Sequence, residues 1–96
     1  MLVLAAYDVS TETAAGRKRL RRVAKVCKDY GQRVQKSLFE CLVGEKELAL
    51  LRSQLLDEIN EQEDSLRLYL LDEVTRERTE HYGLGTPVDL EGPLVV

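Results

Sequence analysis

The sequence is poor in residue types on which several classes of protein depend. It has two cysteines, two prolines, no tryptophan and a single histidine among 96 residues. Two cysteines without zinc-ligand spacing exclude a disulfide scaffold and a zinc module, so we expect a reducing, cytoplasmic setting. One histidine excludes a metal centre of several histidine ligands within one chain, and the serines Ser10 and Ser37 have no histidine base nearby in the sequence to support a serine hydrolase.

Long apolar runs and nucleotide-binding motifs are also missing. No segment approaches the roughly 20 apolar residues of a membrane span, and no basic segment precedes the apolar start, so neither a membrane segment nor a signal peptide is expected. Neither a P-loop nor a GxGxxG motif occurs. Hydrophobic residues make up 44% of the chain and charged residues 32%, the balance of one small globular domain. A domain of this size would gain stability from oligomerisation.

Charge is unevenly distributed along the chain. The net charge is −3, yet nine basic residues and one acidic residue lie between Arg17 and Lys36, and 14 acidic and five basic residues follow from Glu40 onward. A local basic patch matters more for phosphate binding than the total charge does. Composition alone leaves two interpretations open, a phosphate-binding surface and a solvated helix face.

Apolar periodicity predicts the element order β-α-β-β-α-β. Strand-like segments are expected at 2–7, 33–43 and 66–71. A bend near 36–37 would divide the second segment into two short strands. Helices are expected at 13–30 and 45–59, the first of them followed by Gly31, a residue type common just past a helix end. The order is typical of a ferredoxin-like α+β domain over residues 1–72, with a tail at 73–96 rich in glycine and proline.

Asp8 is a candidate metal ligand. It ends a strongly apolar strand and is followed by small hydroxyl residues and a helix start. Mg²⁺ keeps most of its waters and needs only one or two protein oxygens plus substrate phosphate, so a strand-end carboxylate can hold it. A capping or turn aspartate is the alternative. A single carboxylate supplies few ligands for a metal ion. A two-fold axis beside the sheet would add a second one, by bringing two Asp8 side chains into one cleft.

Basic and aromatic residues are candidates for contact with nucleic acid. Seven cations lie between Arg17 and Lys28, and phosphate binding needs several cations on one face. Arg33 lies on a predicted strand beside the core, where it would be held in place. Tyr7 and Phe39 could stack on bases or fill the core, and the sequence leaves both roles open.

Two motifs resemble the Cas2 family of CRISPR-associated proteins. Tyr7 and Asp8 end the first strand as a YD pair, and residues 29–41 read DYGQRVQKSLFEC. The combination of this YD with GxRVQxSxFEC is specific, and the likeness covers roughly residues 1–72. The family often has an aromatic residue where Lys36 stands, which is a minor departure.

The resemblance implies a ferredoxin-like fold and a homodimer, with a C-terminal strand, here 88–96, exchanged onto the partner's sheet. It implies cleavage of RNA or double-stranded DNA that depends on Mg²⁺ or Mn²⁺ in some members, and a bridging role beside an integrase subunit in spacer acquisition. Asp8 matches the family's metal-binding aspartate. Positions beside it that affect activity or substrate contact match Tyr7, Arg33 and Phe39. One or more basic positions of the first helix match Arg17, Arg19 and Arg22.

Three functions are therefore compatible with the sequence. The first is a metal-dependent endonuclease in which Asp8 from each protomer holds a cation. The second is a non-catalytic, nucleic-acid-binding structural adaptor for the integrase. The third is a toxin-like RNA-binding domain with a ferredoxin fold.

Overall fold

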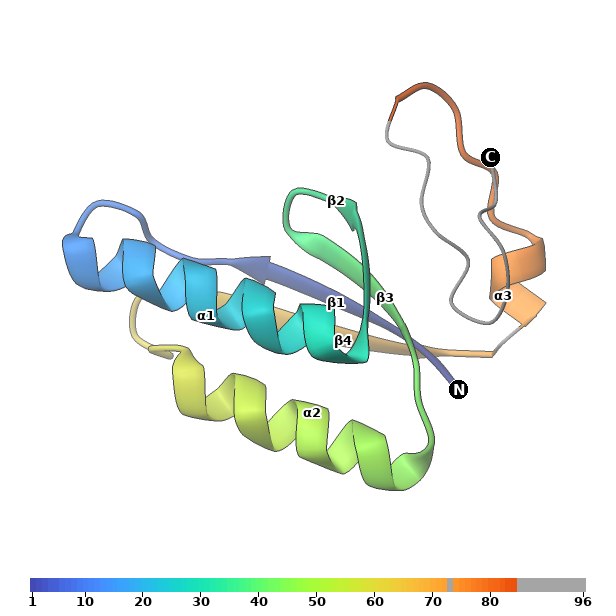
Figure 1. Ribbon diagram of the computed structural model, residues 1–96, viewed down its shortest axis with the longest axis horizontal. Coiled ribbons are helices and arrows are strands. Elements are labelled where there is room, and N and C mark those ends of the chain that lie inside the picture. Colours follow the sequence, from blue (N-terminus) through green and yellow to red (C-terminus); the bar gives the residue numbers. More distant parts are fainter. Residues whose placement is uncertain (73, 85–96) are drawn as a thin grey trace.

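The computed structural model describes residues 1–72 and 74–84, which form four strands and three helices. In chain order these are β1 (Leu2–Asp8), α1 (Ala14–Tyr30), β2 (Gly31–Gln35), β3 (Leu38–Leu42), α2 (Glu45–Glu58), β4 (Ser65–Leu71) and α3 (Val74–Glu77). The strands make one antiparallel sheet in the order β2-β3-β1-β4, and α1 and α2 run side by side (Figure 1). The predicted β-α-β-β-α-β order and the ferredoxin-like α+β fold are confirmed.

β1 is a central strand, and its side chains alternate between the two faces of the sheet. Val3, Ala5 and Tyr7 are buried toward the helices, and Phe39 and Cys41 of β3 pair with β1 on that same face. The helices contribute to this cluster one stripe each at spacings of three or four residues: Val23 and Cys27 of α1, and Leu48, Leu51 and Leu55 of α2. The core therefore lies between the sheet and the two helices.

The opposite face of the sheet carries the alternate positions of the same strands. Leu4 and Ala6 of β1 lie there beside Leu38 and Leu42 of β3, and all four are only partly buried. Asp8 ends this row and is exposed. One face of the sheet thus supports the core, and the other presents apolar side chains around Glu40, with the Asp8 carboxylate at its end.

The junction between α1 and β2 differs from the prediction. Gly31 does follow the helix, but its backbone is extended (φ −163°, ψ −158°) and it is already the first residue of β2, two residues before the expected strand start. A Cβ at this position would overlap the carbonyl oxygen of Glu40 and lie 2.6 Å from the sulfur of Cys41. Glycine is needed here because β2 and β3 approach closely, and no left-handed turn is involved.

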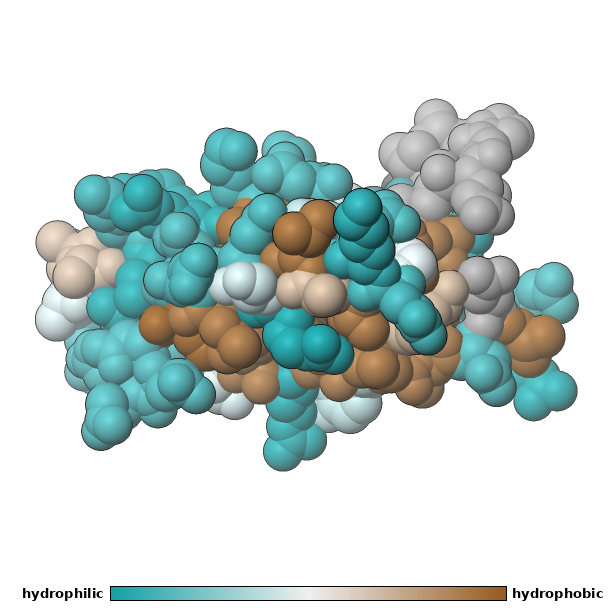
Figure 2. Space-filling model, turned by 90° about the horizontal axis from the view of Figure 1, so that it is seen from below, coloured by the Kyte–Doolittle hydropathy of each residue, from teal (hydrophilic) through white to brown (hydrophobic). Residues whose placement is uncertain are grey.

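The side of the molecule seen in Figure 2 is partly apolar. Apolar side chains form a band along its long axis, on the side where α2 is the nearest element (Figures 1 and 2). Exposed leucines on α2 and the edge strand β4 include Leu50, Leu56 and Leu70. This side therefore offers apolar contacts along the band, with hydrophilic side chains flanking it (Figure 2).

Two predictions concern the tail. The short helix α3 was not predicted, because a run of charged residues at 74–81 has no apolar periodicity. The predicted strand at 88–96 lies outside the described residues. Among the described helices, none is both long and apolar enough to cross a membrane.

Candidate metal and nucleic-acid site

Asp8 is placed at the end of β1 as the sequence predicted. It pairs with Ser65 of β4 in the antiparallel register, and its side chain is exposed on the face opposite α1 and α2. Within the described residues its carboxylate takes part in no ion pair or side-chain hydrogen bond, so it does not act as a cap. The carboxylate is therefore available to a cation.

The surroundings of Asp8 suit a cation that keeps its water ligands better than a cation enclosed by protein side chains. Among residues 1–72 and 74–84, no group of three or more histidine, cysteine and acidic side chains could enclose a metal ion. Mg²⁺ does not require such a group, because it retains waters and binds through one or two carboxylates and substrate phosphates. A single exposed carboxylate such as Asp8 fits this mode.

Tyr7 and Phe39 lie in the core on the helix-facing side of the sheet, the face opposite to that of Asp8. They are 5% and 1% exposed, and their rings stack with centroids 6.2 Å apart. Burial raises the pKa of the Tyr7 hydroxyl, against the opposing effect of Arg33. Of the two roles that the sequence left open, this burial favours core filling.

Arg33 is held at the surface by this aromatic pair. Its guanidinium carbon lies 5.2 Å from the centroid of the Phe39 ring, while its side chain belongs to an exposed position on the edge strand β2. A cation stacked on a ring keeps its donors free for another anion. The expectation that Arg33 is held in place agrees with this geometry.

Three of the basic residues of α1 face carboxylates. Arg19 contacts Asp64 at 2.9 Å and Glu63 at 3.3 Å. Arg22 pairs with Glu58 of α2 at 3.2 Å, and Lys25 with Asp29 one turn along the helix at 3.7 Å. Arg19 and Arg22 were predicted to contact nucleic acid, and in this structure their charges are already balanced.

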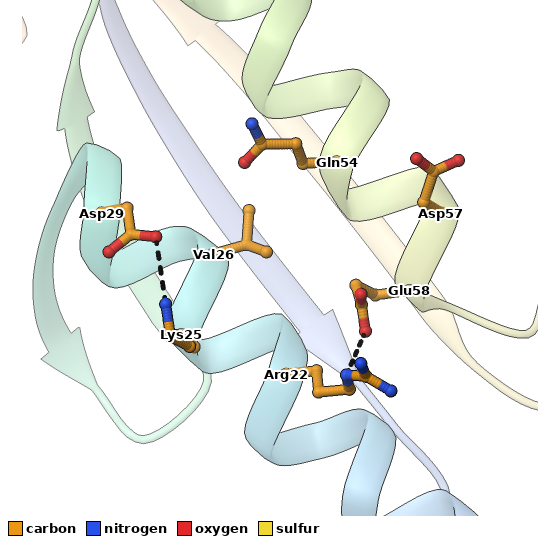
Figure 3. Close-up of a pocket in the computed structure, with 7 residues that line it drawn as sticks. All are labelled: Arg22, Lys25, Val26, Asp29, Gln54, Asp57 and Glu58. Carbon is orange, nitrogen blue, oxygen red and sulfur yellow. Dashed lines mark ion pairs between the residues drawn. The ribbon is translucent and has the colours of Figure 1, made fainter.

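Arg22 and Lys25 lie in a shallow groove of ≈ 350 Å³ between α1 and α2. Figure 3 shows Arg22 directed at Glu58 across the groove and Lys25 directed at Asp29. The remaining lining residues are Val26, Gln54 and Asp57. The groove combines both signs of charge with paired cations, so it is unsuited to binding phosphate, and Asp8 does not line it.

The other cations of α1 remain unpaired. Within the described residues Lys18, Arg21 and Lys28 are exposed and make no ion pair. Arg17 donates a hydrogen bond to the carbonyl oxygen of Thr11 at 3.1 Å, which leaves its charge unbalanced. Position 21 is about one helical turn from position 17, and position 28 is about three turns from it, so these three residues share one side of α1.

Asp64 is a functional candidate that the sequence analysis missed. Its side chain has no exposed surface, and Arg19 beside it is 17% exposed. Burial opposes ionisation, but hydrogen bonds from Arg19 and from the N–H groups of Asn60 and Ser10 outweigh it and hold the pKa of Asp64 below its usual value. The residue stands in an acidic loop without a motif, and only the pairing of β1 with β4 brings it near Asp8.

The two cysteines have no role as nucleophiles. Both are buried, and burial raises the pKa of Cys27 to about 12 and that of Cys41 to about 11. Thiols with such values stay protonated near neutral pH and are inert.

Comparison with known proteins places these features in a family. Residues 1–79 match the family model described as CRISPR associated protein Cas2. The chain is 53% identical to the CRISPR-associated endoribonuclease Cas2 1 of Moorella thermoacetica and 55% identical to the CRISPR-associated endoribonuclease Cas2 of Chlorobaculum tepidum, over the full length of each. It is 50% identical to the CRISPR-associated endonuclease Cas2 of Halalkalibacterium halodurans over 99% of both chains.

A solved structure gives the same result. The crystal structure of Streptococcus pyogenes Cas2 at pH 6.5 superposes with a TM-score of 0.78 at 54% identity, covering 86% of this chain and 100% of that one. A hypothetical protein from Thermus thermophilus aligns with a TM-score of 0.67 at 30% identity, over 90% of this chain and 92% of the other. The family match, the near full-length relatives and the shared fold agree, and the chain belongs to the CRISPR-associated Cas2 family.

Proposed function

We propose that this protein is a metal-dependent endonuclease of CRISPR spacer acquisition, which acts on RNA or double-stranded DNA as a homodimer beside an integrase subunit. The relatives named endoribonuclease and endonuclease support hydrolysis of phosphodiester bonds. The observation that carries the proposal is the exposed, unpaired carboxylate of Asp8 at the end of β1.

In this proposal Asp8 holds a hydrated Mg²⁺ or Mn²⁺ ion. When bound, such a cation polarises the phosphate and makes a water molecule more acidic. Asp8 orients the cation at the end of the sheet. Arg33, held by Phe39 at the β2 edge on the face opposite Asp8, offers a fixed positive charge to a different phosphate group, and Tyr7 supports the Phe39 ring from the core.

The outer face of the sheet supports a dimer. Leu4, Ala6, Leu38 and Leu42 lie on it as apolar side chains around Glu40, and apolar groups interspersed with charge on an open sheet face are compatible with an interface between copies. Gln32 pairs with Glu40 on this face, and its Oε1 is buried without a hydrogen-bond partner in the described structure. A donor from a second copy would satisfy that acceptor. A two-fold axis there also brings two Asp8 carboxylates together.

The unpaired cations of α1 support binding of a polyanion. Lys18, Arg21 and Lys28 are exposed, and the paired cations on the side of α2 do not compete with them. Contacts of this kind go to the sugar–phosphate backbone and carry no sequence information, so the proposed binding is independent of sequence.

A non-catalytic adaptor is the second candidate. It is favoured by the single carboxylate, because Asp8 of one chain supplies only one ligand and the described residues offer no cluster that could complete the site. An adaptor would use the same basic surface and the same dimer, and would hold a nucleic acid for the integrase without cutting it.

Replacing Asp8 with asparagine tests the proposal. Asp8→Asn keeps the size of the side chain and removes its charge, so cleavage in the presence of Mg²⁺ or Mn²⁺ should fall by at least about 100-fold while binding of nucleic acid persists. Cleavage of a labelled RNA and of a duplex DNA is measured with each metal and with chelator. Sedimentation of both proteins at micromolar concentration should show a dimer.

The outcomes separate the candidates. Intact metal-dependent cleavage in purified Asp8→Asn protein would remove Asp8 from the reaction. Tight binding without cleavage by the parent protein would identify the adaptor instead. A monomer that binds metal through Asp8 would contradict the shared site.

A further inference from the structure

The carboxylate of Asp64 is fully enclosed although it is charged. Its Oδ1 accepts hydrogen bonds from the N–H of Ser10 at 3.1 Å and from Nη2 of Arg19 at 3.3 Å. Its Oδ2 accepts from the N–H of Asn60 at 2.9 Å and from Nε of Arg19 at 2.9 Å. Both oxygens are thus occupied by donors from three separate parts of the chain.

These donors surround the end of the sheet that carries Asp8. Ser10 is two residues beyond Asp8, in the segment that leads from β1 to α1. Asp64 is the residue before Ser65, and Ser65 is the partner of Asp8 across the β1–β4 ladder. The Asp64 carboxylate therefore joins the backbone just after Asp8 to the backbone that pairs with it.

The segment between Asp8 and α1 has little freedom of its own. Thr13 caps α1 by accepting the N–H of Gly16 at 3.0 Å. Gly16 lies so close to the Ser10 carbonyl oxygen that a Cβ would overlap it. Val9 is buried at 6% exposure. A shift of Ser10 would therefore be passed on to its neighbour Asp8 and not absorbed by a flexible loop.

We propose that Arg19 and Asp64 form a positioning pair that fixes the backbone after Asp8 and so directs the Asp8 carboxylate toward a divalent cation; this rests on the proposed function. A buried ion pair contributes little net stability to a protein. The role assigned here to the Arg19–Asp64 pair is therefore to hold the backbone in place. Groups outside the ligand shell that orient a metal ligand commonly change metal affinity by about 10–100-fold. Arg19 thereby acts on the site indirectly, without touching phosphate.

The test uses Asp64→Asn in the full chain, with Glu63→Gln as the matched control. Glu63 also pairs with Arg19, at 3.3 Å, but it is 45% exposed and makes no contact with Ser10 in the described structure. Mn²⁺ binding is measured by calorimetry, and exchange of the Ser10 amide hydrogen by nuclear magnetic resonance. We expect Mn²⁺ affinity to fall by about tenfold or more in Asp64→Asn, with faster Ser10 exchange, and both to stay near parental values in Glu63→Gln.

The two measurements distinguish a failure of this inference from a failure of the proposed function on which it rests. Unchanged Mn²⁺ affinity, or unchanged Ser10 exchange, in a folded Asp64→Asn protein overturns the positioning role. If the Asp8→Asn variant binds Mn²⁺ as tightly as the parent protein does, the metal site itself is misassigned, whatever the exchange of the Ser10 amide shows. Should Asp64→Asn fail to fold, Arg19→Lys replaces it as the test. This variant keeps the positive charge but loses one of the two hydrogen bonds from residue 19 to Asp64. An unchanged Mn²⁺ affinity in Arg19→Lys would then overturn the positioning role.

Discussion

The two long sides of α1 carry the same kinds of residue and differ in what faces them. Toward α2 and the 60–64 loop, Arg19 and Arg22 meet the carboxylates of Asp64 and Glu58. On the side away from α2, Arg21 and Lys28 meet no acidic partner within the described residues. A cation that is already balanced gains little from a phosphate, so under the proposed function the side away from α2 is the one expected to bind nucleic acid.

Charge reversal of the unpaired cations should have the largest effect. With Arg21 and Lys28, the two unpaired cations on the side away from α2, changed to glutamate, duplex affinity at 0.1 M salt should fall by about two orders of magnitude, because each lost phosphate contact removes roughly 0.9 from the slope of log affinity against log salt. A salt titration of duplex binding measures both quantities. The thermal midpoint should change little, since exposed charges contribute little to folding.

The matched control reverses the paired cations. With Arg22 and Lys25 changed to glutamate, affinity should fall by less than about eightfold, the effect of one phosphate contact at this salt concentration. Equal losses in the two variants would contradict the distinction between the two sides of the helix.

Lowering the pH should weaken the contribution of the buried Arg19–Asp64 pair to the free energy of unfolding, and this distinguishes it from the exposed ion pairs of α1. Hydrogen bonds and the Arg19 charge hold the pKa of Asp64 below its usual value in the folded state, so its contribution to stability is present above about pH 4, the unfolded value, and is lost as pH falls through the folded value. Urea denaturation from pH 7 to pH 2.5 should show this loss. Asp64→Asn should be less stable at pH 7 and should depend less on pH; an identical pH profile would contradict the assignment.

Removing the acidic partner of Arg22 should have the smallest effect. Glu58→Gln leaves Arg22 without its 3.2 Å ion pair and so makes the α2 side resemble the other side. Duplex affinity should rise by at most about eightfold, with a slope steeper by up to about 0.9, as for one added phosphate contact. Salt titration beside the parent protein measures this. A lower affinity would mean that the Arg22–Glu58 pair itself supports the binding surface.

Local patterns were sufficient to predict the fold. The continuous apolar run at 2–7 predicted the strand β1, and the spacing of Leu48, Leu51 and Leu55 predicted the helix α2 with its buried stripe. The position of Asp8 at a strand end followed from the same pattern. Such signals depend on neighbours in the sequence, and the structure placed each of these residues as expected.

The electrostatic state of the candidate site could not be predicted in this way. Arg19 and Arg21 look alike in the sequence, and only the pairing of distant segments places Asp64 against the first and no carboxylate against the second. The close approach of Gly31 to Glu40 is likewise a property of two adjacent strands. Contacts between residues far apart in the chain decide which charges remain free, and periodicity carries no information about them.

The antiparallel ladder between β1 and β4 also bears on how the protein folds. Asp8 pairs with Ser65, and the nearby hydrogen bond between Ser10 and Asp64 joins residues 54 positions apart. Closing such a long loop carries an entropic cost that the adjacent strands β2 and β3 do not bear. We expect the β2–β3 hairpin to form early and the β1–β4 ladder late, so a partly folded chain would contain a sheet but no arranged Asp8. Under the proposed function, the metal site at Asp8 would then be complete only after the last step of folding.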